Sequence, residues 1–179
     1  MELISYQIDG HDEITAVSDS WTSFAASNAA ADLTEQVVGH SMWDFVCGDT
    51  TRQVYRDLLT RVRDGRTVTF SYRCDSFALR RFMQMTMTPG PRNGVHFDSL
   101  ILRIEPRVPP IFTGQVTGQI DPLLLVCSWC KLVAVGEEWD EVEVAIERLG
   151  LFAGSSPPAI THGMCPSCVT RILGDDHAA

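Results

Sequence analysis

Residues 83–104 read MQMTMTPGPRNGVHFDSLILRI, and this stretch decides the fold that the sequence predicts. Met83, Met85 and Met87 alternate with polar residues, which is the pattern of a strand with one buried face. A second apolar run begins at Val95, after a loop rich in proline and glycine. Together the two runs predict an antiparallel hairpin.

Three further strands are predicted before this hairpin. Apolar and polar residues alternate over Ile4–Ile8, and a second short run covers Ile14–Val17. A third run begins at Val68 and ends near Cys74. The chain should therefore have two strands near its start and a meander of three strands later.

Helices are predicted between the second and the third of these strands. Ser18 or Asp19 can cap the first helix. Asp49 or Thr50 can cap a longer helix, whose apolar residues recur every three or four positions until Gly65 ends it. The order is thus two strands, several short helices and a three-stranded meander.

This order and several short segments resemble a PAS domain of a bacterial subgroup. The similar segments are residues 14–25 (ITAVSDSWTSFA), 38–45 (VGHSMWDF), 72–76 (YRCDS) and 80–83 (RRFM). The resemblance covers Leu3 to Arg107. It implies a five-stranded antiparallel sheet with helices on one side and a small pocket between them. It also implies sensing or protein–protein signalling rather than catalysis, with a homodimer as one possible assembly.

Four of the six cysteines form two Cys-x-x-Cys pairs, Cys127 with Cys130 and Cys165 with Cys168. In a reducing compartment clustered cysteines are metal ligands more often than disulfides. Each pair can form a tight turn with two sulfurs facing one ion, and two such turns supply a tetrahedral site. We predict structural zinc, with an iron–sulfur cluster as the alternative because it uses the same ligands.

The predicted fold class is α+β, with four segments along the chain. Residues 1–107 form the PAS-like domain, and residues 108–122 form a linker rich in proline and glycine. Residues 123–174 form the four-cysteine module, and residues 175–179 form a polar tail. Because the linker has no apolar periodicity, we expect the domain and the module to have separate cores.

The module is predicted to resemble a zinc ribbon or a treble clef. Residues 131–135 should pair with a strand at Glu138–Trp139, and a helix should follow over residues 141–149. Pro166 suits the first turn of a last helix, where its missing N–H is not needed. The segments CSWCK (127–131) and THGMCPSC (161–168) are similar to a cysteine module at the ends of bacterial PAS and receiver-type signalling proteins.

Three roles are open for His162, which precedes Cys165 by three residues. It could replace one cysteine as a ligand and give a site of three sulfurs and one nitrogen. It could donate a hydrogen bond to a coordinating sulfur. It could also be a partly exposed loop histidine that takes no role in the site.

Other reactive side chains are assigned to packing or to the surface. His40 and His96 are expected at the surface, and the methionine stripe is expected in the core, although thioethers also bind copper(I). Cys47 and Cys74 are isolated and are interpreted as small apolar fillers or surface thiols. Neither a phosphate-binding loop nor a nucleophile motif appears, so we expect no enzymatic activity.

The net charge of −9 disfavours nucleic acid and anionic membranes as partners. No apolar run approaches the roughly 18 residues of a membrane span, and the first residues do not resemble a signal peptide. We therefore expect a cytoplasmic protein that meets a protein partner, a small-molecule ligand, or both.

These observations predict a stand-alone signalling adaptor. The PAS-like domain would sense a small ligand or bind a partner, and the zinc module would stabilise the C-terminus. The main alternative is a redox or metal sensor in which the four cysteines are the input. A zinc-ribbon nucleic-acid binder and an enzyme are weaker alternatives, and the sequence does not name the ligand of the PAS pocket.

Overall fold

The computed structural model describes residues 3–28, 30–76, 78–107, 123–150 and 159–173. The predicted linker (108–122) and the polar tail (175–179) lie outside the described residues. The described fold is α+β, as predicted. None of the described helices combines the length and the apolar character that crossing a bilayer requires.

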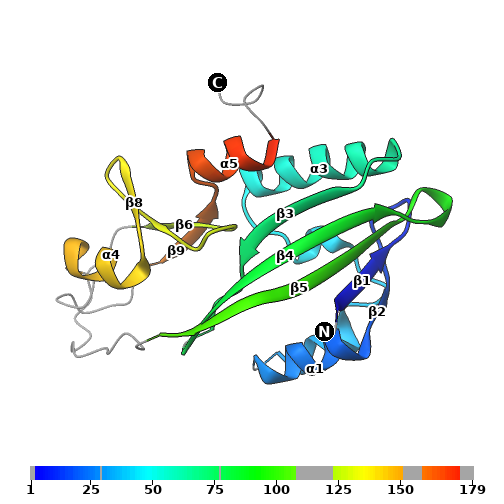
Figure 1. Cartoon of the computed structure of the whole chain (residues 1–179), viewed down its shortest axis with the longest axis horizontal. Coiled ribbons are helices and arrows are strands. Elements are labelled where there is room, and N and C mark those ends of the chain that lie inside the picture. The colour runs from blue at the N-terminus through cyan, green and yellow to red at the C-terminus, as the bar shows by residue number, and fades with distance from the viewer. Residues whose placement is uncertain (1–2, 29, 77, 108–122, 151–158, 174–179) are drawn as a thin grey trace.

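A five-stranded antiparallel sheet forms the N-terminal region (Figure 1). Its strands in spatial order are β2 (Ile14–Val17), β1 (Ile4–Ile8), β5 (Val95–Pro106), β4 (Leu79–Pro89) and β3 (Val68–Arg73). The predicted hairpin is β4 and β5, in which Met87 lies opposite Phe97. The first two strands have the predicted bounds.

The inner face of the sheet is apolar because its side chains alternate along each strand. Met83, Met85 and Met87 are 1%, 5% and 0% exposed, and Phe97 beside them is fully buried. The expectation that the methionine stripe packs in the core is therefore confirmed.

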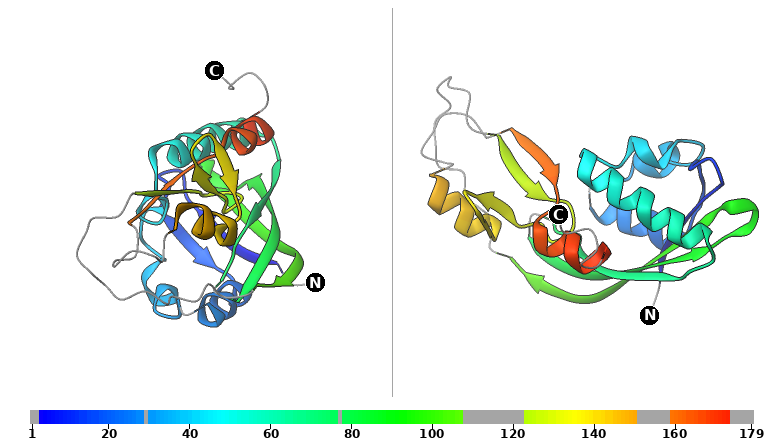
Figure 2. Two further views of the ribbon diagram at one scale, coloured as in Figure 1. Left: turned by 90° about the vertical axis from the view of Figure 1, so that its left-hand side faces the viewer. Right: turned by 90° about the horizontal axis from the view of Figure 1, so that it is seen from above.

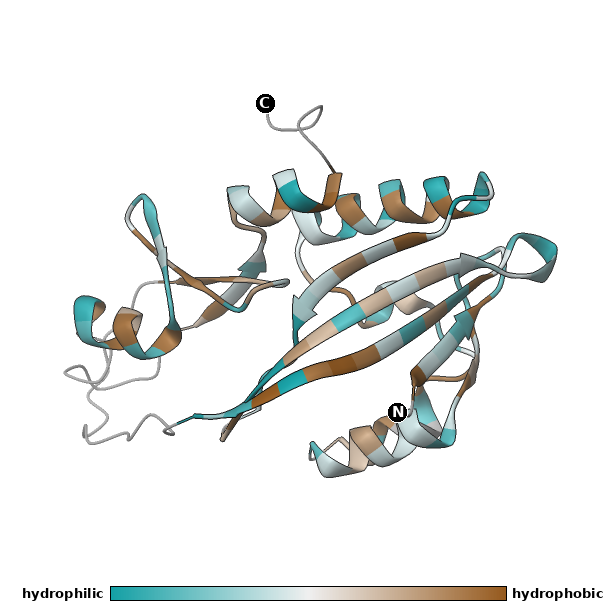
Figure 3. Ribbon diagram, in the orientation of Figure 1, coloured by the Kyte–Doolittle hydropathy of each residue, from teal (hydrophilic) through white to brown (hydrophobic). Residues whose placement is uncertain are grey.

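Helices cover this face of the sheet (Figure 2). They are α1 (Asp19–Ser27), α2 (Leu33–Gln36), the 3₁₀ turn η1 (Met42–Asp44) and α3 (Asp49–Arg63). The Ser18 side chain caps α1 by accepting the backbone N–H of Trp21, as predicted. Figure 3 shows apolar and polar bands alternating along α3, whose apolar side is buried against the sheet.

The start of α3 corrects one prediction. Neither Asp49 nor Thr50 caps the helix, because the cap position is Gly48, with φ of 86° and no side-chain hydrogen bond. A Cβ at Gly48 would collide with the backbone carbonyl of His162 from the C-terminal region. A long-range contact therefore selects glycine here, and local capping rules do not see such a contact.

The C-terminal region contains a second, four-stranded sheet with two helices. Its elements are β6 (Leu124–Cys127), β7 (Val133–Val135), β8 (Glu138–Asp140), α4 (Val142–Leu149), β9 (Ile160–Gly163) and α5 (Pro166–Leu173). The predicted pairing of β7 with β8 and both predicted helices are confirmed. The sequence analysis did not foresee that β6 and β9 form a parallel pair.

The expectation of two separate cores is wrong. Trp129, Met164 and Ile172 of the C-terminal region belong to the same buried cluster as Leu58 and Phe97. In Figure 1, α5 lies beside α3. Among the described residues, a small second cluster is confined to the C-terminal region, and it consists of Leu124, Val133, Val135 and Ala145.

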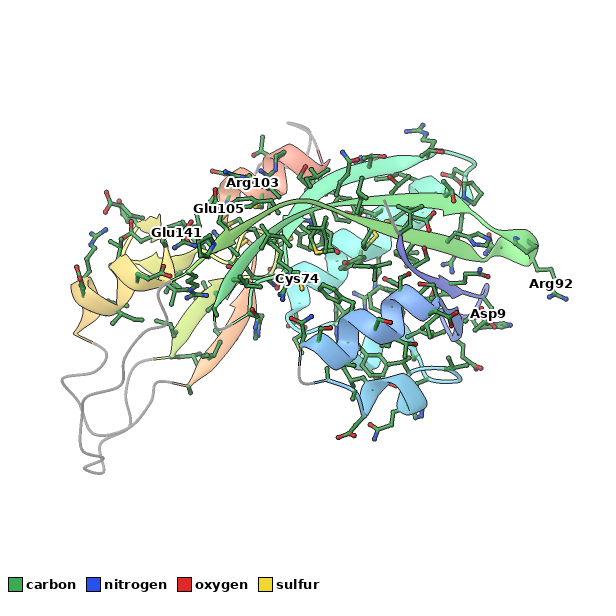
Figure 4. The ribbon with its side chains drawn as sticks, turned by 60° about the horizontal axis from the view of Figure 1, so that its bottom comes forward. Asp9, Cys74, Arg92, Arg103, Glu105 and Glu141 are labelled. Atoms are coloured by element: carbon green, nitrogen blue, oxygen red, sulfur yellow. The ribbon has the colours of Figure 1, made fainter. Side chains whose placement is uncertain are left out.

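Polar contacts also connect the N-terminal and C-terminal regions, and we call this contact between them the joint. The backbone N–H of Arg73 donates to the carbonyl of Trp129 at 2.7 Å. The Arg73 guanidinium pairs with Glu141 at 2.7 Å, and Arg107 pairs with Glu143 at 2.6 Å. Figure 4 places Glu141 where the C-terminal region meets one end of the sheet, whereas Asp9 and Arg92 lie at the other end.

Candidate metal centre

Four cysteine sulfurs come together where the two regions of the chain meet. Cys127 ends β6, and Cys130 lies in the turn that follows it. Cys165 directly precedes α5, and Cys168 lies in the first turn of that helix. The four Sγ atoms all lie within 4.8 Å of one another.

The first pair is shaped by a turn between β6 and β7. The backbone N–H of Lys131 donates to the carbonyl of Cys127 at 3.0 Å, and the N–H of Cys127 donates to the carbonyl of Leu132 at 2.8 Å. Lys131 has φ of 62°, in the left-handed region that residues with a side chain rarely adopt. This conformation turns the chain back so that both sulfurs of the pair face the same side.

The second pair uses the start of a helix instead. Pro166 is the first residue of α5, and the N–H groups of Cys168 and Val169 both donate to the carbonyl of Cys165 at 3.0 and 3.1 Å. The backbone N–H of Cys165 also donates to Cys127 Sγ at 3.4 Å. This last bond links one pair to the other.

The electrostatics of the cluster favour a bound cation. A hydrogen bond from Cys130 and another from Cys168 lower the pKa of Cys127. The pKa of Cys130 is raised, chiefly by its hydrogen bond to Cys127, and the pKa of Cys168 is raised chiefly by its own hydrogen bond to Cys127. Cys127, Cys130 and Cys168 thus share protons, because thiolates this close repel each other. A thiophilic cation removes that conflict, since it deprotonates the thiols that bind it.

The spacing of the sulfurs fits zinc. A tetrahedron with Zn–S bonds of about 2.3 Å has S···S edges of about 3.8 Å. Cys130 Sγ lies 3.7 Å from Cys165 Sγ, a distance that spans the two pairs. Arg171 also donates to Cys168 Sγ at 3.2 Å, and a cationic donor stabilises a thiolate.

His162 lies on β9, and its side chain is exposed. Its ring nitrogens are not among the four-sulfur group. Within the described residues of the chain, no hydrogen bond joins it to a cysteine sulfur. The side chain instead lines a nearby cavity.

The remaining candidates lie apart from this cluster. Cys47 is exposed and Cys74 is half-buried, and neither sulfur belongs to the group. Figure 4 shows Cys74 close to the middle of the molecule. His40 is exposed, and His96 is half-buried between two buried neighbours on β5.

Three cavities lie in or beside the contact between the two regions. One of about 250 Å³ lies between the sheet and its covering helices, where the PAS resemblance placed a pocket, and Tyr6, Ile14 and Trp21 line it. A second, of about 280 Å³, lies between the two regions of the chain, with Trp129 and Lys131 in its wall. The sequence analysis gave these two residues no role, although Trp129 stands inside a cysteine pair. A third, of about 390 Å³, also lies between the two regions, and ion-paired side chains, among them Arg73 and Glu141, line it.

Comparison with protein families finds no family model that matches this chain. A search of curated proteins gives no significant match either. The functional proposal therefore depends on the geometry and chemistry of the site itself.

Proposed function

We propose that the protein is a PAS-like signalling adaptor whose four clustered cysteines bind one structural zinc ion. The observation that carries this proposal is the approach of all four sulfurs within 4.8 Å of one another. Cys127, Cys130, Cys165 and Cys168 would hold the ion, and four cysteine ligands are typical of closed, structural zinc sites. In this proposal the C-terminal region resembles a zinc ribbon or a treble clef.

The ion would stabilise a region of the chain that has little core of its own. Within the part of the chain that the structure describes, the cluster confined to the C-terminal region has four buried residues. In small metal-binding modules the free energy of metal binding is also free energy of folding. Zinc would thereby hold Trp129 and α5 against α3 and β3.

The N-terminal region would be the sensing or partner-binding element. Its five-stranded antiparallel sheet, its helices on one face and the 250 Å³ cavity between them are what the PAS resemblance implies. Its partner would be a small ligand, another protein or a second copy of this chain. A reducing compartment such as the cytoplasm would keep the four thiols available for metal.

Elemental analysis with an absorption spectrum tests the proposal directly. The chain would be purified without added metal and under exclusion of oxygen. We expect one zinc per chain and a colourless solution. Iron with sulfide and visible absorption would overturn structural zinc and make an iron–sulfur cluster the resident group.

One observation favours a second function, that of a redox sensor. Cys130 is half-buried, and its sulfur lies 3.7 Å from that of Cys165 in the other pair. Hydrogen peroxide could take two electrons from these two zinc-bound thiolates and leave a disulfide. The peroxide would take up two protons from solvent and become two water molecules, and the metal would be released. Reversible zinc release under mild peroxide would support this function, and retention of zinc under strong peroxide would exclude it.

A further inference from the structure

The cavity between the two regions of the chain has the size of a small-ligand site. Its volume is about 280 Å³, near the lower end of the roughly 300–1,000 Å³ typical of such sites. Its walls come from α3, β3 and the turn of the first cysteine pair. We call it the joint cavity, to separate it from the 250 Å³ cavity under the helices and from the 390 Å³ cavity beside Arg73 and Glu141.

The apolar walls of the joint cavity are aromatic and well packed. The ring of Trp129 lies 5.1 Å from that of Tyr55 and 5.6 Å from that of Phe70, measured between centroids. The hydroxyl of Tyr72, which also lines the cavity, is held by a hydrogen bond to Ser99 at 2.9 Å. Fixed aromatic faces of this kind favour a flat, aromatic guest over a flexible chain.

The polar groups of the cavity include an unpaired cation. Lys131 donates one hydrogen bond, to the carbonyl of Ser128 at 2.7 Å, although an ammonium has three donors. No carboxylate oxygen of the described residues lies within 4.0 Å of its Nζ atom. Asp75, an acid nearby, is already paired with Arg73.

A second donor in the wall also lacks an acceptor. Trp129 is 2% exposed, and its indole N–H has no partner among the described residues. A buried donor without an acceptor is unfavourable, because it has lost its hydrogen bond to water and gained none in return. The Thr51 hydroxyl donates to the Ser128 hydroxyl at 2.9 Å, and neither of these oxygens accepts from the indole N–H. The cavity therefore offers the positive charge of Lys131 within aromatic walls, and the buried indole N–H of Trp129 is a second donor without a partner.

We propose that the joint cavity binds a small aromatic carboxylate. The carboxylate would accept from Lys131, and the ring would lie among Tyr55, Phe70 and Trp129. The inference rests on the proposed zinc site in one respect, because Trp129 lies within the first cysteine pair and Lys131 follows it. It extends the proposed function, since the C-terminal region then supplies a wall of a ligand site.

Lys131 has one competing role, which predicts different results. Four thiolates around a divalent ion carry a net negative charge, and a neighbouring ammonium can balance it. In that case loss of the Lys131 charge would weaken zinc retention and leave ligand binding unchanged. The experiment therefore measures zinc and ligand separately.

Calorimetric titration with three probes tests the proposal on the full zinc-loaded chain. The probes are benzoate, phenylacetate and indole-3-acetate, and benzamide is the uncharged match to benzoate. We expect at least one carboxylate to bind, and benzamide to bind at least about tenfold more weakly than benzoate. Lys131→Met removes the ammonium and keeps an unbranched side chain with its Cβ, so the strain at φ of 62° is unchanged. This variant should weaken carboxylate binding by about tenfold or more, because hydrogen bonds to charged groups contribute about 1.5–3 kcal/mol.

Leu33→Phe is the control variant, since Leu33 is partly exposed and lines the 250 Å³ cavity but not the joint cavity. It should leave carboxylate affinity unchanged, and both variants should retain the zinc content of the parent chain. If Leu33→Phe weakened carboxylate binding and Lys131→Met did not, the ligand would bind in the 250 Å³ cavity, and the proposal would be wrong. Absence of binding by all three carboxylates at millimolar concentration while zinc is present would also overturn the proposal. If the purified chain held no zinc, the proposed function would be refuted. The ligand proposal would still be tested by comparing the carboxylate affinities of the parent chain and the two variants.

Cysteine alkylation locates the ligand without relying on any variant. Cys47 is exposed and lines the joint cavity, whereas Cys74 does not line it. A bound carboxylate should slow the reaction of Cys47 with iodoacetamide several-fold and leave the rate at Cys74 unchanged, as followed by peptide mass analysis. Equal rates at Cys47 with and without saturating ligand would place the ligand elsewhere.

Discussion

The two Cys-x-x-Cys pairs have the same spacing but lie in different local structures. In the first pair the residues between the cysteines face inward, with Ser128 half-buried and Trp129 buried. In the second pair Pro166 and Ser167 are exposed at the start of α5. With equal spacing, both pairs place their sulfurs at the same point. The residues between the cysteines are packed inside the protein in the first pair and face solvent in the second.

This difference separates two tasks, which are binding the metal ion and holding the C-terminal region against the N-terminal region. Both pairs are needed to surround one ion, and in that respect they are equivalent. Only the first pair carries side chains that enter the core of the N-terminal region, through Trp129 against Tyr55 and Phe70. The variants below test the equivalence first and then the asymmetry.

The largest effect should come from removing a ligand. Cys127→Ser and Cys165→Ser should each abolish zinc binding and lower the free energy of unfolding by several kcal/mol, because metal binding supplies folding free energy. Since the core is shared, the N-terminal region should lose stability as well. Zinc analysis and urea unfolding followed by circular dichroism would measure both effects. Zinc retained in one variant and lost in the other would contradict the equivalence of the pairs.

The second position within each pair gives the sharpest contrast. Trp129→Ala should lower the free energy of unfolding by about 3–5 kcal/mol, since it leaves a large hole in the core. Ser167→Ala occupies the same position in the second pair and should change it by no more than about 0.5 kcal/mol, because Ser167 is exposed. Urea midpoints of the two variants, compared at equal zinc content, give the answer. Similar losses in both would show that Trp129 does not fasten the two regions together.

The first position within each pair should give a smaller contrast. Thr51→Val removes the hydroxyl that bonds to Ser128 at 2.9 Å, and we expect a loss of about 1 kcal/mol. Pro166→Ala keeps the start of α5 and should cost less than about 1 kcal/mol, through greater freedom of the unfolded chain. Thermal unfolding of both variants would rank them. If Thr51→Val left the stability unchanged, this hydrogen bond would contribute nothing to holding the two regions together.

Lys131, the residue after the first pair, should give the smallest change of all. Lys131→Gly relieves the strain of a left-handed conformation, which costs roughly 1–2 kcal/mol, but it loses the bond to Ser128. We therefore expect a net change near zero. Val169→Gly, at the matching position inside α5, has no strain to relieve and should cost at least about 1 kcal/mol. A large loss in Lys131→Gly would assign the Lys131 side chain a structural task beyond this single bond.

Local patterns predicted the elements well where neighbours in sequence decide the structure. The bounds of Ile4–Ile8 and Ile14–Val17 are correct, because alternation of apolar residues is a local signal. The cap at Ser18 and Pro166 in the first turn of α5 are correct for the same reason. The predicted cap of α3 was wrong because a backbone carbonyl far away in the sequence, that of His162, leaves no room for a side chain at Gly48.

Pairing between distant segments was harder to predict. The strands β6 and β9 pair in parallel across the whole of α4, and each is only four residues long. Such short runs give too little periodicity to mark a strand, and parallel pairing leaves no hairpin signal between them. Their pairing is nonetheless what brings the second cysteine pair beside the first.

The sequence by itself determined the α+β order of elements and the four cysteines with the spacing of a metal site. Both follow from residue type and from distances along the chain, which are local quantities. Only the tertiary structure decided that the first cysteine pair joins the core of the N-terminal region, and that Trp129 and Lys131 line a cavity there. Periodicity tells which face of an element is apolar, but the surface that this face meets depends on contacts between residues as distant as Thr51 and Ser128.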